Sequence, residues 1–60
     1  MRVFYSGIGE AGKISQVREQ PNCPRIGETV EWADGVEYEV KHVMSTPFNR
    51  EYDAYCVVTP

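Results

Sequence analysis

The sequence predicts an all-β protein that folds as a small five-stranded barrel. Three observations lead to this fold class: a hairpin pattern in the middle of the chain, short runs of β-branched and aromatic residues bounded by Gly, Pro or Ser, and connections of a few residues. We expect strands near 2–5, 13–19, 28–33, 36–43 and 53–59. All 60 residues then form a single domain, 1–60, near the lower size limit for folding alone.

A β-hairpin is predicted for residues 26–43, IGETVEWADGVEYEVKHV. Asp34-Gly35 is a common two-residue turn, but that register would mix charged and apolar side chains on both faces. A three-residue loop that also includes Ala33 sorts them, because opposite residues of an antiparallel ladder share a face. Such a loop needs a positive φ at its last residue, which Gly35 adopts without a Cβ clash.

In this register one face of the hairpin is apolar and the other is acidic. The apolar face carries Val30, Trp32, Val36, Tyr38 and Val40. The acidic face places Glu31 opposite Glu37, an arrangement of like charges that destabilises a ladder slightly. Glu39 follows two residues along, and Asp34 lies at the tip. This face is either a solvated surface that keeps a small protein soluble or a recognition surface for a basic partner.

Residues 44–52, MSTPFNREY, form a predicted loop because of their Ser-Thr-Pro and Asn content. The loop carries Phe48, Arg50 and Tyr52, residue types that are enriched at binding hot spots. Alternatively, Phe48 and Tyr52 fold back and cap one end of the barrel. The last run, 53–59, is apolar on both faces, which predicts a strand that is buried on both sides or covered by another subunit.

The first run ends at Ser6 and Gly7, and residues 7–12, GIGEAG, have the letters of a phosphate-binding fingerprint. That fingerprint works when it opens a helix inside a strand-helix-strand unit. Pro21 and Pro24 prevent a long helix here, so we expect a hairpin loop instead.

Segment 13–19, KISQVRE, is compatible with two structures. As a strand it places Ile14 and Val17 on opposite faces, and as a helix it places them on one face. Seven residues are few for a helix, so the strand is favoured over a short helix from Glu10 to Gln20.

The segments Val3-Phe4-Tyr5-Ser6-Gly7 and Gly12-Lys13-Ile14-Ser15-Gln16-Val17 resemble the KOW motif of small SH3-like barrels. In that motif a strand, a glycine-bearing loop and a Gly-Lys-x-Gly-x-Val stretch follow one another. Ser15 replaces the second glycine, the loop is longer, and the basic residues that suit KOW domains to RNA are mostly absent. The resemblance implies an SH3-like (or OB-like) barrel more than RNA binding.

The net charge is −3 at pH 7, and the six basic residues form no run. This balance argues against tight binding along a phosphate backbone, where affinity comes from Lys and Arg. The N-terminus lacks the apolar core of a signal peptide, and no window approaches the roughly 20 apolar residues of a membrane span. We therefore expect a cytoplasmic protein without a membrane partner.

Two cysteines are too few for a disulfide framework, so we expect thiols, with Cys56 in the core and Cys23 exposed. A bridge between them is the less favoured alternative. His42, the single histidine, is expected in a structural role on the apolar face, although a bulge near Lys41 would turn Val43 inward instead. No short metal-ligand spacing and no nucleophile-base-orienter set is present, so no metal, cofactor or catalytic residue is predicted.

These observations favour a non-enzymatic binding module that recognises a protein. The predicted contact surface combines the acidic hairpin with the loop that follows it. Its residues are Glu31, Trp32, Asp34, Glu37, Glu39, Phe48, Arg50 and Tyr52. A short acidic chain that begins at its own Met1 also suits a viral (phage) or mobile-element accessory protein that inhibits a host factor.

Two other function classes stay open. A nucleic-acid-binding module of KOW or OB type predicts a cluster of basic side chains beside exposed aromatic ones, drawn from Lys13, Arg18, Arg25 and Arg50. A small-ligand-binding or sequestering homo-oligomer predicts a pocket at a subunit boundary, with the amides of Gly7–Gly12 as an anion nest.

Overall fold

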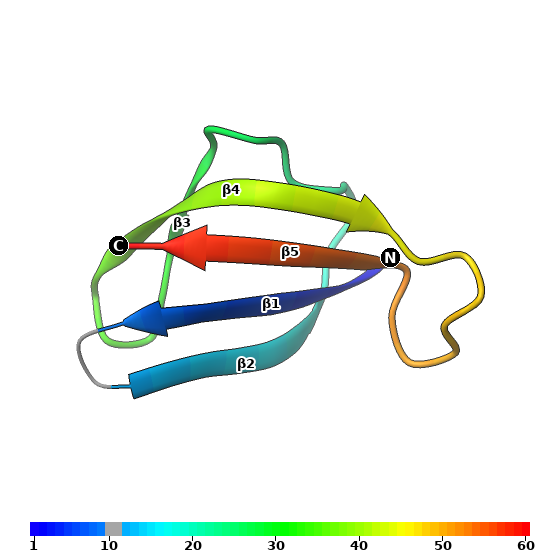
Figure 1. Cartoon of the computed structure of the whole chain (residues 1–60), viewed down its shortest axis with the longest axis horizontal. Coiled ribbons are helices and arrows are strands. Elements are labelled where there is room, and N and C mark those ends of the chain that lie inside the picture. Colours follow the sequence, from blue (N-terminus) through cyan, green and yellow to red (C-terminus); the bar gives the residue numbers. More distant parts are fainter. Residues whose placement is uncertain (10–11) are drawn as a thin grey trace.

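The computed structural model describes residues 1–9 and 12–60, and these residues form a single curled β-sheet (Figure 1). Its strands are β1 (Arg2–Gly9), β2 (Gly12–Glu19), β3 (Thr29–Glu31), β4 (Glu37–Ser45) and β5 (Ala54–Thr59). The strand order is β2-β1-β5-β4-β3, with β1 and β5 parallel and the other neighbours antiparallel. The sheet curls through 201° into a half-barrel, which confirms the predicted small all-β barrel.

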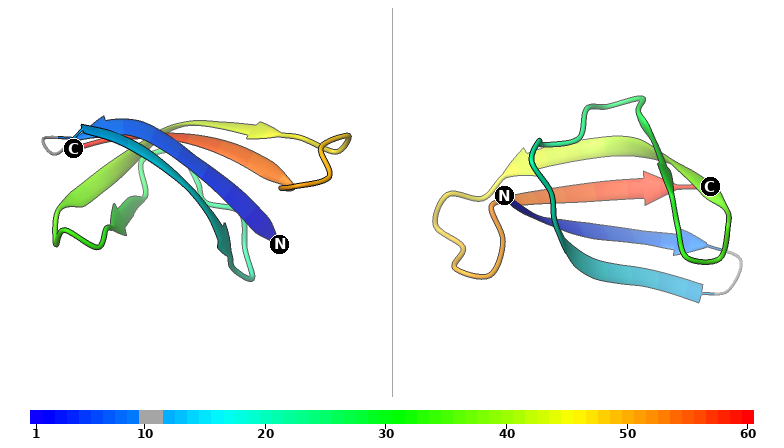
Figure 2. Two further views of the ribbon diagram at one scale, coloured as in Figure 1. Left: turned by 90° about the horizontal axis from the view of Figure 1, so that it is seen from below. Right: turned by 180° about the vertical axis from the view of Figure 1, so that it is seen from behind.

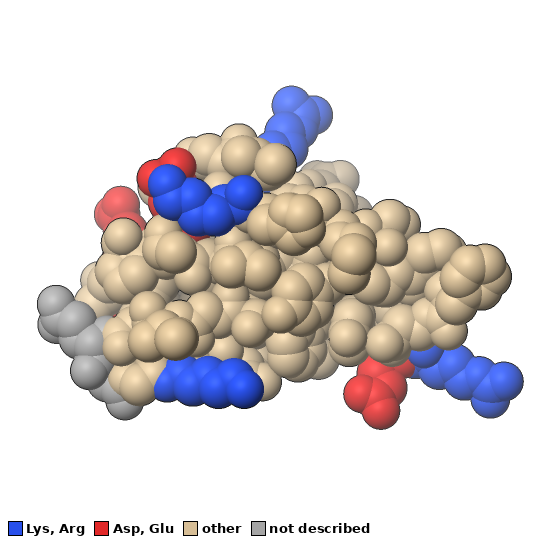
Figure 3. Space-filling model, viewed as in Figure 1, with Lys and Arg blue, Asp and Glu red and all other residues tan. Residues whose placement is uncertain are grey.

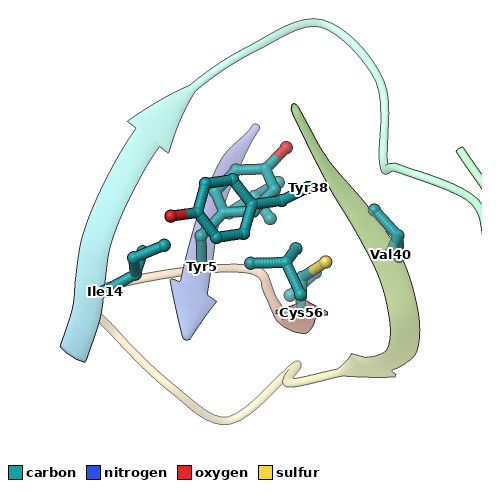
Figure 4. Close-up of a cluster of buried hydrophobic side chains, with 8 residues drawn as sticks. Tyr5, Ile14, Tyr38, Val40 and Cys56 are labelled. Carbon is teal, nitrogen blue, oxygen red and sulfur yellow. The ribbon is translucent and has the colours of Figure 1, made fainter. Parts of the chain in front are cut away.

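The hydrophobic core lies on the concave face of this sheet (Figure 2). Its buried members are Val3, Tyr5, Ile14, Tyr38, Val40, Ala54, Cys56 and Val58. Tyr5 and Tyr38 are the largest of them and fill the middle of the half-barrel (Figure 4). No helix in the described part of the chain is long and apolar enough to cross a membrane.

The predicted register of the hairpin is confirmed. Strands β3 and β4 pair Thr29 with Glu39, Val30 with Tyr38 and Glu31 with Glu37. Beyond β3, the Trp32 amide donates to the Val36 carbonyl at 3.0 Å. All the predicted apolar residues of the hairpin belong to the concave core or pack against it.

The turn between β3 and β4 has the three predicted residues, 33–35. The Gly35 amide donates to the Trp32 carbonyl at 2.9 Å, and Gly35 has a φ of 82°. Asp34 fixes the turn with its carboxylate, which accepts from the Val36 amide at 2.9 Å and from the Tyr38 hydroxyl at 3.2 Å. The acidic residue at the tip therefore stabilises the turn itself.

Strand β1 is longer than the sequence predicted. We expected it to end at Tyr5, with Ser6 and Gly7 as breakers, but it continues to Gly9. The reason is a close approach between neighbouring strands: a Cβ at Gly7 would overlap the Val58 carbonyl. Gly7 and Gly9 are strand residues, and no helix follows them in the described chain. A phosphate-binding site at residues 7–12 would need such a helix, so this interpretation lacks its structural context. Residues 10 and 11, part of the predicted loop, lie outside the described residues.

Segment 12–19 is the strand β2, so the alternative of a helix over this segment is wrong. Ile14 points to the concave face and is 8% exposed, whereas Val17 on the other face is 42% exposed. The period-2 alternation therefore separates the two β-branched residues as expected for a strand.

Strand β4 contains a β-bulge near Lys41, the alternative that turns Val43 inward. Its register shifts between Val40 and His42, which brings Val43 opposite Cys56 and partly buries it against the core. His42 is exposed, so the expected place for it on the apolar face is wrong. The bulge adds one extra residue to β4, so beyond it the side chains that would have faced the core face outward and the others face inward.

We expect Gly7→Ala to lower the free energy of unfolding by about 2 kcal/mol, because the added methyl group collides with the backbone of β5. The measurement is urea unfolding followed by Trp32 fluorescence. Ser6→Ala, on the opposite face of the same strand, is the control and should change stability by less than about 0.5 kcal/mol. Equal effects of the two substitutions would contradict this packing.

Candidate functional site

The acidic residues of the hairpin lie on its outer side and differ in their surroundings. Glu31 and Glu37 face each other across the ladder, and both are exposed. Glu39 lies 3.2 Å from the ammonium group of Lys41, and this ion pair is about half exposed. Glu31 and Glu37 therefore form the part of the acidic side where like charges are juxtaposed, and a basic partner would relieve that repulsion.

Trp32 is half-buried and makes internal contacts instead of pointing into solvent. Its ring lies edge-on to Tyr5 and to Tyr38, with centroid distances of 5.5 and 6.1 Å. The guanidinium carbon of Arg18, on β2, lies 4.1 Å from the Trp32 ring centroid. This cation-π contact joins the hairpin to the opposite edge of the half-barrel.

The loop between β4 and β5, residues 46–53, is held by a network of hydrogen bonds. The side-chain oxygen of Asn49 accepts from the amides of Glu51 and Tyr52, at 2.8 and 3.2 Å. The Thr46 hydroxyl donates to the Tyr52 carbonyl at 3.1 Å, and the Thr46 amide donates to the Asp53 carbonyl at 3.0 Å. The loop is therefore an ordered projection of the sheet.

Phe48 lies in the turn that the Asn49 amide closes by donating to the Thr46 carbonyl at 3.1 Å, and it is 98% exposed. The alternative in which it folds back to cap the barrel is therefore wrong. Tyr52 does fold back, but onto Phe4 of β1, with ring centroids 5.1 Å apart. The guanidinium of Arg2 donates to the Arg50 carbonyl at 2.8 Å, so the Arg50 backbone anchors the loop to the first strand.

An aromatic row continues from this loop across the convex face of the sheet. The ring of Phe4 stacks on that of Tyr55, with centroids 5.4 Å apart and an interplanar angle of 11°. With Tyr52, these residues form a row of three rings, which we call the aromatic row. Figure 3 shows this face: its middle is free of charged side chains, and the charged ones lie at its rim.

Sequence reasoning missed Phe4 and Tyr55 as site residues. Both lie at outward positions of runs that were correctly predicted to be strands. What places them side by side is the parallel pairing of β1 with β5, in which Phe4 is opposite Tyr55. A parallel pair formed by the two ends of a chain leaves no local signal, so alternation alone could not have found this contact.

The predicted contact residues do not form one surface. The hairpin tip and the loop 46–53 lie at opposite ends of the long axis of the molecule (Figure 1). Glu31, Glu37 and Glu39 belong to the first region, whereas Phe48, Arg50 and Tyr52 belong to the second.

The four cations predicted for a nucleic-acid surface do not all lie together. Arg18 packs on Trp32, and Arg50 lies in the loop at the other end of the molecule from the hairpin tip. Lys13 stands at the start of β2, close to the hairpin tip, since both line one shallow depression. Two of these cations, Lys13 and Arg18, therefore lie beside Trp32, and Arg50 is far from them.

Neither cysteine forms a disulfide: Cys23 is an exposed thiol and Cys56 a buried one. Burial raises the pKa of Cys56 to about 11, and the negative potential of Cys23 and Glu28 adds to the effect. Within residues 1–9 and 12–60, no group of three His, Cys, Asp or Glu side chains could hold a metal ion.

No protein-family model, curated protein or solved structure matches this chain. The surfaces of the chain itself are therefore the basis for assigning a function.

Two substitutions test the contact of Arg18 with Trp32. Arg18→Met keeps an apolar stem but removes the cation, and we expect it to lower the free energy of unfolding by about 1 kcal/mol. Arg25→Met, in the exposed segment between β2 and β3, should have a smaller effect. Equal stability of the two variants in urea unfolding would argue against the cation-π contact.

We expect the two thiols to differ strongly in reactivity towards a disulfide reagent at pH 8. Cys23 should react at once in the native protein, because its thiol is exposed to the reagent. Cys56 should react only as the protein unfolds, since it is buried and its pKa is raised. Cys23→Ser should abolish the fast phase; two fast thiols in the native protein would contradict the burial of Cys56.

Proposed function

We propose that this chain is a non-enzymatic module that binds another protein through Phe48 and the aromatic row. The observation that carries the proposal is the position of Phe48: a fully exposed aromatic side chain at the end of a loop fixed by its own hydrogen bonds. The backbone of a loop that is already fixed by hydrogen bonds loses little conformational freedom on binding, so more of the contact energy of its side chains appears as affinity.

The surroundings of Phe48 support the same proposal. The aromatic row adjoins the loop through Tyr52 and extends onto the convex face, where Met44 is 49% exposed. Aromatic residues and Met are enriched in protein interfaces, and charged residues are depleted from their centres. A partner could therefore take Phe48 into a pocket and cover the flatter row beside it.

The acidic side of the hairpin is a second candidate for the same function class. The juxtaposition of Glu31 and Glu37 favours it, because a basic partner would neutralise two carboxylates that otherwise repel each other. Such charges act mainly on the association rate and on specificity. In either case, binding alone would act by occupying the partner's surface, as expected of a phage or mobile-element accessory protein.

The rival classes have weaker support. The KOW resemblance and its implied RNA binding would need Arg50 to act from the opposite end of the molecule to Lys13 and Arg18. A sequestering oligomer would use the shallow apolar depression on the convex face, whose lining includes Ser6, Ile8, Tyr55 and Val57. Neither class makes use of the exposed Phe48.

Affinity capture from a lysate of the native cell or host tests the proposal. We expect Phe48→Ser to reduce recovery of the captured protein at least tenfold, as is typical of an aromatic hot spot. Ile26→Ser is the matched control, because Ile26 is also a large exposed apolar residue, at 68%, but lies in the segment before β3. This control should capture as the wild type does.

The pair Glu31→Lys and Glu37→Lys, combined in one variant, distinguishes the two candidate surfaces. Loss of capture in this variant, with full capture by Phe48→Ser, would move the site to the acidic hairpin and overturn our proposal. Salt-sensitive retention of the wild type on a nucleic-acid column would instead support the KOW-type class.

A further inference from the structure

Strand β2 is an open edge of the sheet. It has eight residues and stands at the end of the strand order, with β1 as its single neighbour in the described sheet. In the view from below, β2 is nearest to the reader and no other strand lies in front of it (Figure 2, left). An edge of this length presents unpaired backbone groups that can pair with another chain.

The hydrogen bonds at the end of the β1–β2 ladder show which residues point outward. Gln20 donates its amide to the Met1 carbonyl at 2.8 Å, and the Met1 amino group donates to the Gln20 carbonyl at 2.6 Å. Pairs that exchange such bonds alternate with pairs that do not, and the register runs without interruption along the strand. The residues whose N–H and C=O groups point to the free edge are therefore Lys13, Ser15, Val17 and Glu19.

We propose that a second copy of this chain binds along β2, antiparallel and related by a two-fold axis at Gln16. Outward-pointing residues must face outward-pointing residues, and two-fold symmetry makes each pair occur twice. This register is the one that pairs all the outward residues, with Lys13 opposite Glu19 of the second copy and Ser15 opposite Val17 of the second copy. Each pair exchanges two bonds, which gives about eight backbone hydrogen bonds.

Charge complementarity selects a second copy as the occupant. The register places an ammonium group opposite a carboxylate at both ends of the shared ladder, and directly opposed unlike charges stabilise cross-strand pairs. The Glu19 carboxylate lies 3.4 Å from the Met1 amino group, but its side chain is 75% exposed, so it is open to a second cation. The ion pairs thus arise from this chain's own sequence, without a partner of special composition.

The other edge of the sheet does not offer the same site. Strand β3 has three residues, Thr29–Glu31, and self-pairing there would bring acidic side chains close together. Short edge strands are a common protection against pairing between chains. The two edges therefore differ, and a dimer through β2 closes on itself instead of growing into a fibre.

The dimer is tested by sedimentation velocity of the full chain, from about 10 µM to 1 mM, a range that covers weak interfaces. We expect a monomer-dimer equilibrium for the wild type. Lys13→Glu and Glu19→Lys should each weaken it at least tenfold, because each change makes both end pairs repulsive. Arg25→Glu, which changes the net charge as Lys13→Glu does but lies outside β2, is the matched control and should dimerise as the wild type does.

Mixing the Lys13→Glu variant with the Glu19→Lys variant tests the register itself. In the mixed dimer the two substituted side chains face each other at one end, and the two unchanged ones, Lys13 and Glu19, face each other at the other. Because unlike charges then oppose each other at both ends, we expect the mixture to dimerise at least tenfold more tightly than either variant alone.

A backbone substitution tests the ladder separately from the charges. Ser15→Pro removes one outward N–H without breaking the ladder to β1, and should leave a folded monomer by circular dichroism. A wild type that is monomeric throughout, or a mixture of the charge variants that does not associate, would overturn the proposal.

Discussion

The structure depends on one contact across the concave face: the Tyr38 ring lies against the glycine-bearing end of β1. Strand β5 separates β4 from β1 in the sheet, so this contact exists only because the sheet curls. An added Cβ at Gly9 would overlap the Tyr38 hydroxyl, which leaves this position to glycine. The Tyr38 hydroxyl also donates to Asp34, so the same side chain links the core to the hairpin turn.

This arrangement explains why the hydrophobic core fills the concave face of the sheet while the aromatic row stays on the convex face. A chain of 60 residues forms a single curled layer, and its apolar residues are sufficient for the concave side. The convex side then carries the aromatic row without a second layer to cover it. Recognition of a protein, the function we propose, would use surface that the fold itself leaves uncovered.

The sequence determined the local parts of this fold, because their signals are local. Side-chain alternation and the demand for a positive φ at Gly35 were enough to place the hairpin register. The extension of β1 was missed, because a glycine required by close packing cannot be told from a glycine that ends a strand. Phe48 was singled out from its residue type and its place in a loop, but its full exposure follows from loop hydrogen bonds that composition does not reveal. The contact of Arg18 with Trp32 joins opposite edges of the sheet and was equally out of reach.

The most direct test of the account is a proton NMR measurement of contacts among the aromatic rings. We predict nuclear Overhauser effects from the Trp32 indole to Tyr5 and to the Arg18 side chain, together with effects from the Tyr38 ring protons to the α-protons of Gly9. A solvent-exposed Trp32 with random-coil shifts, paired across the hairpin with Glu37 instead of Val36, would contradict the register on which the core and the acidic side of the hairpin depend.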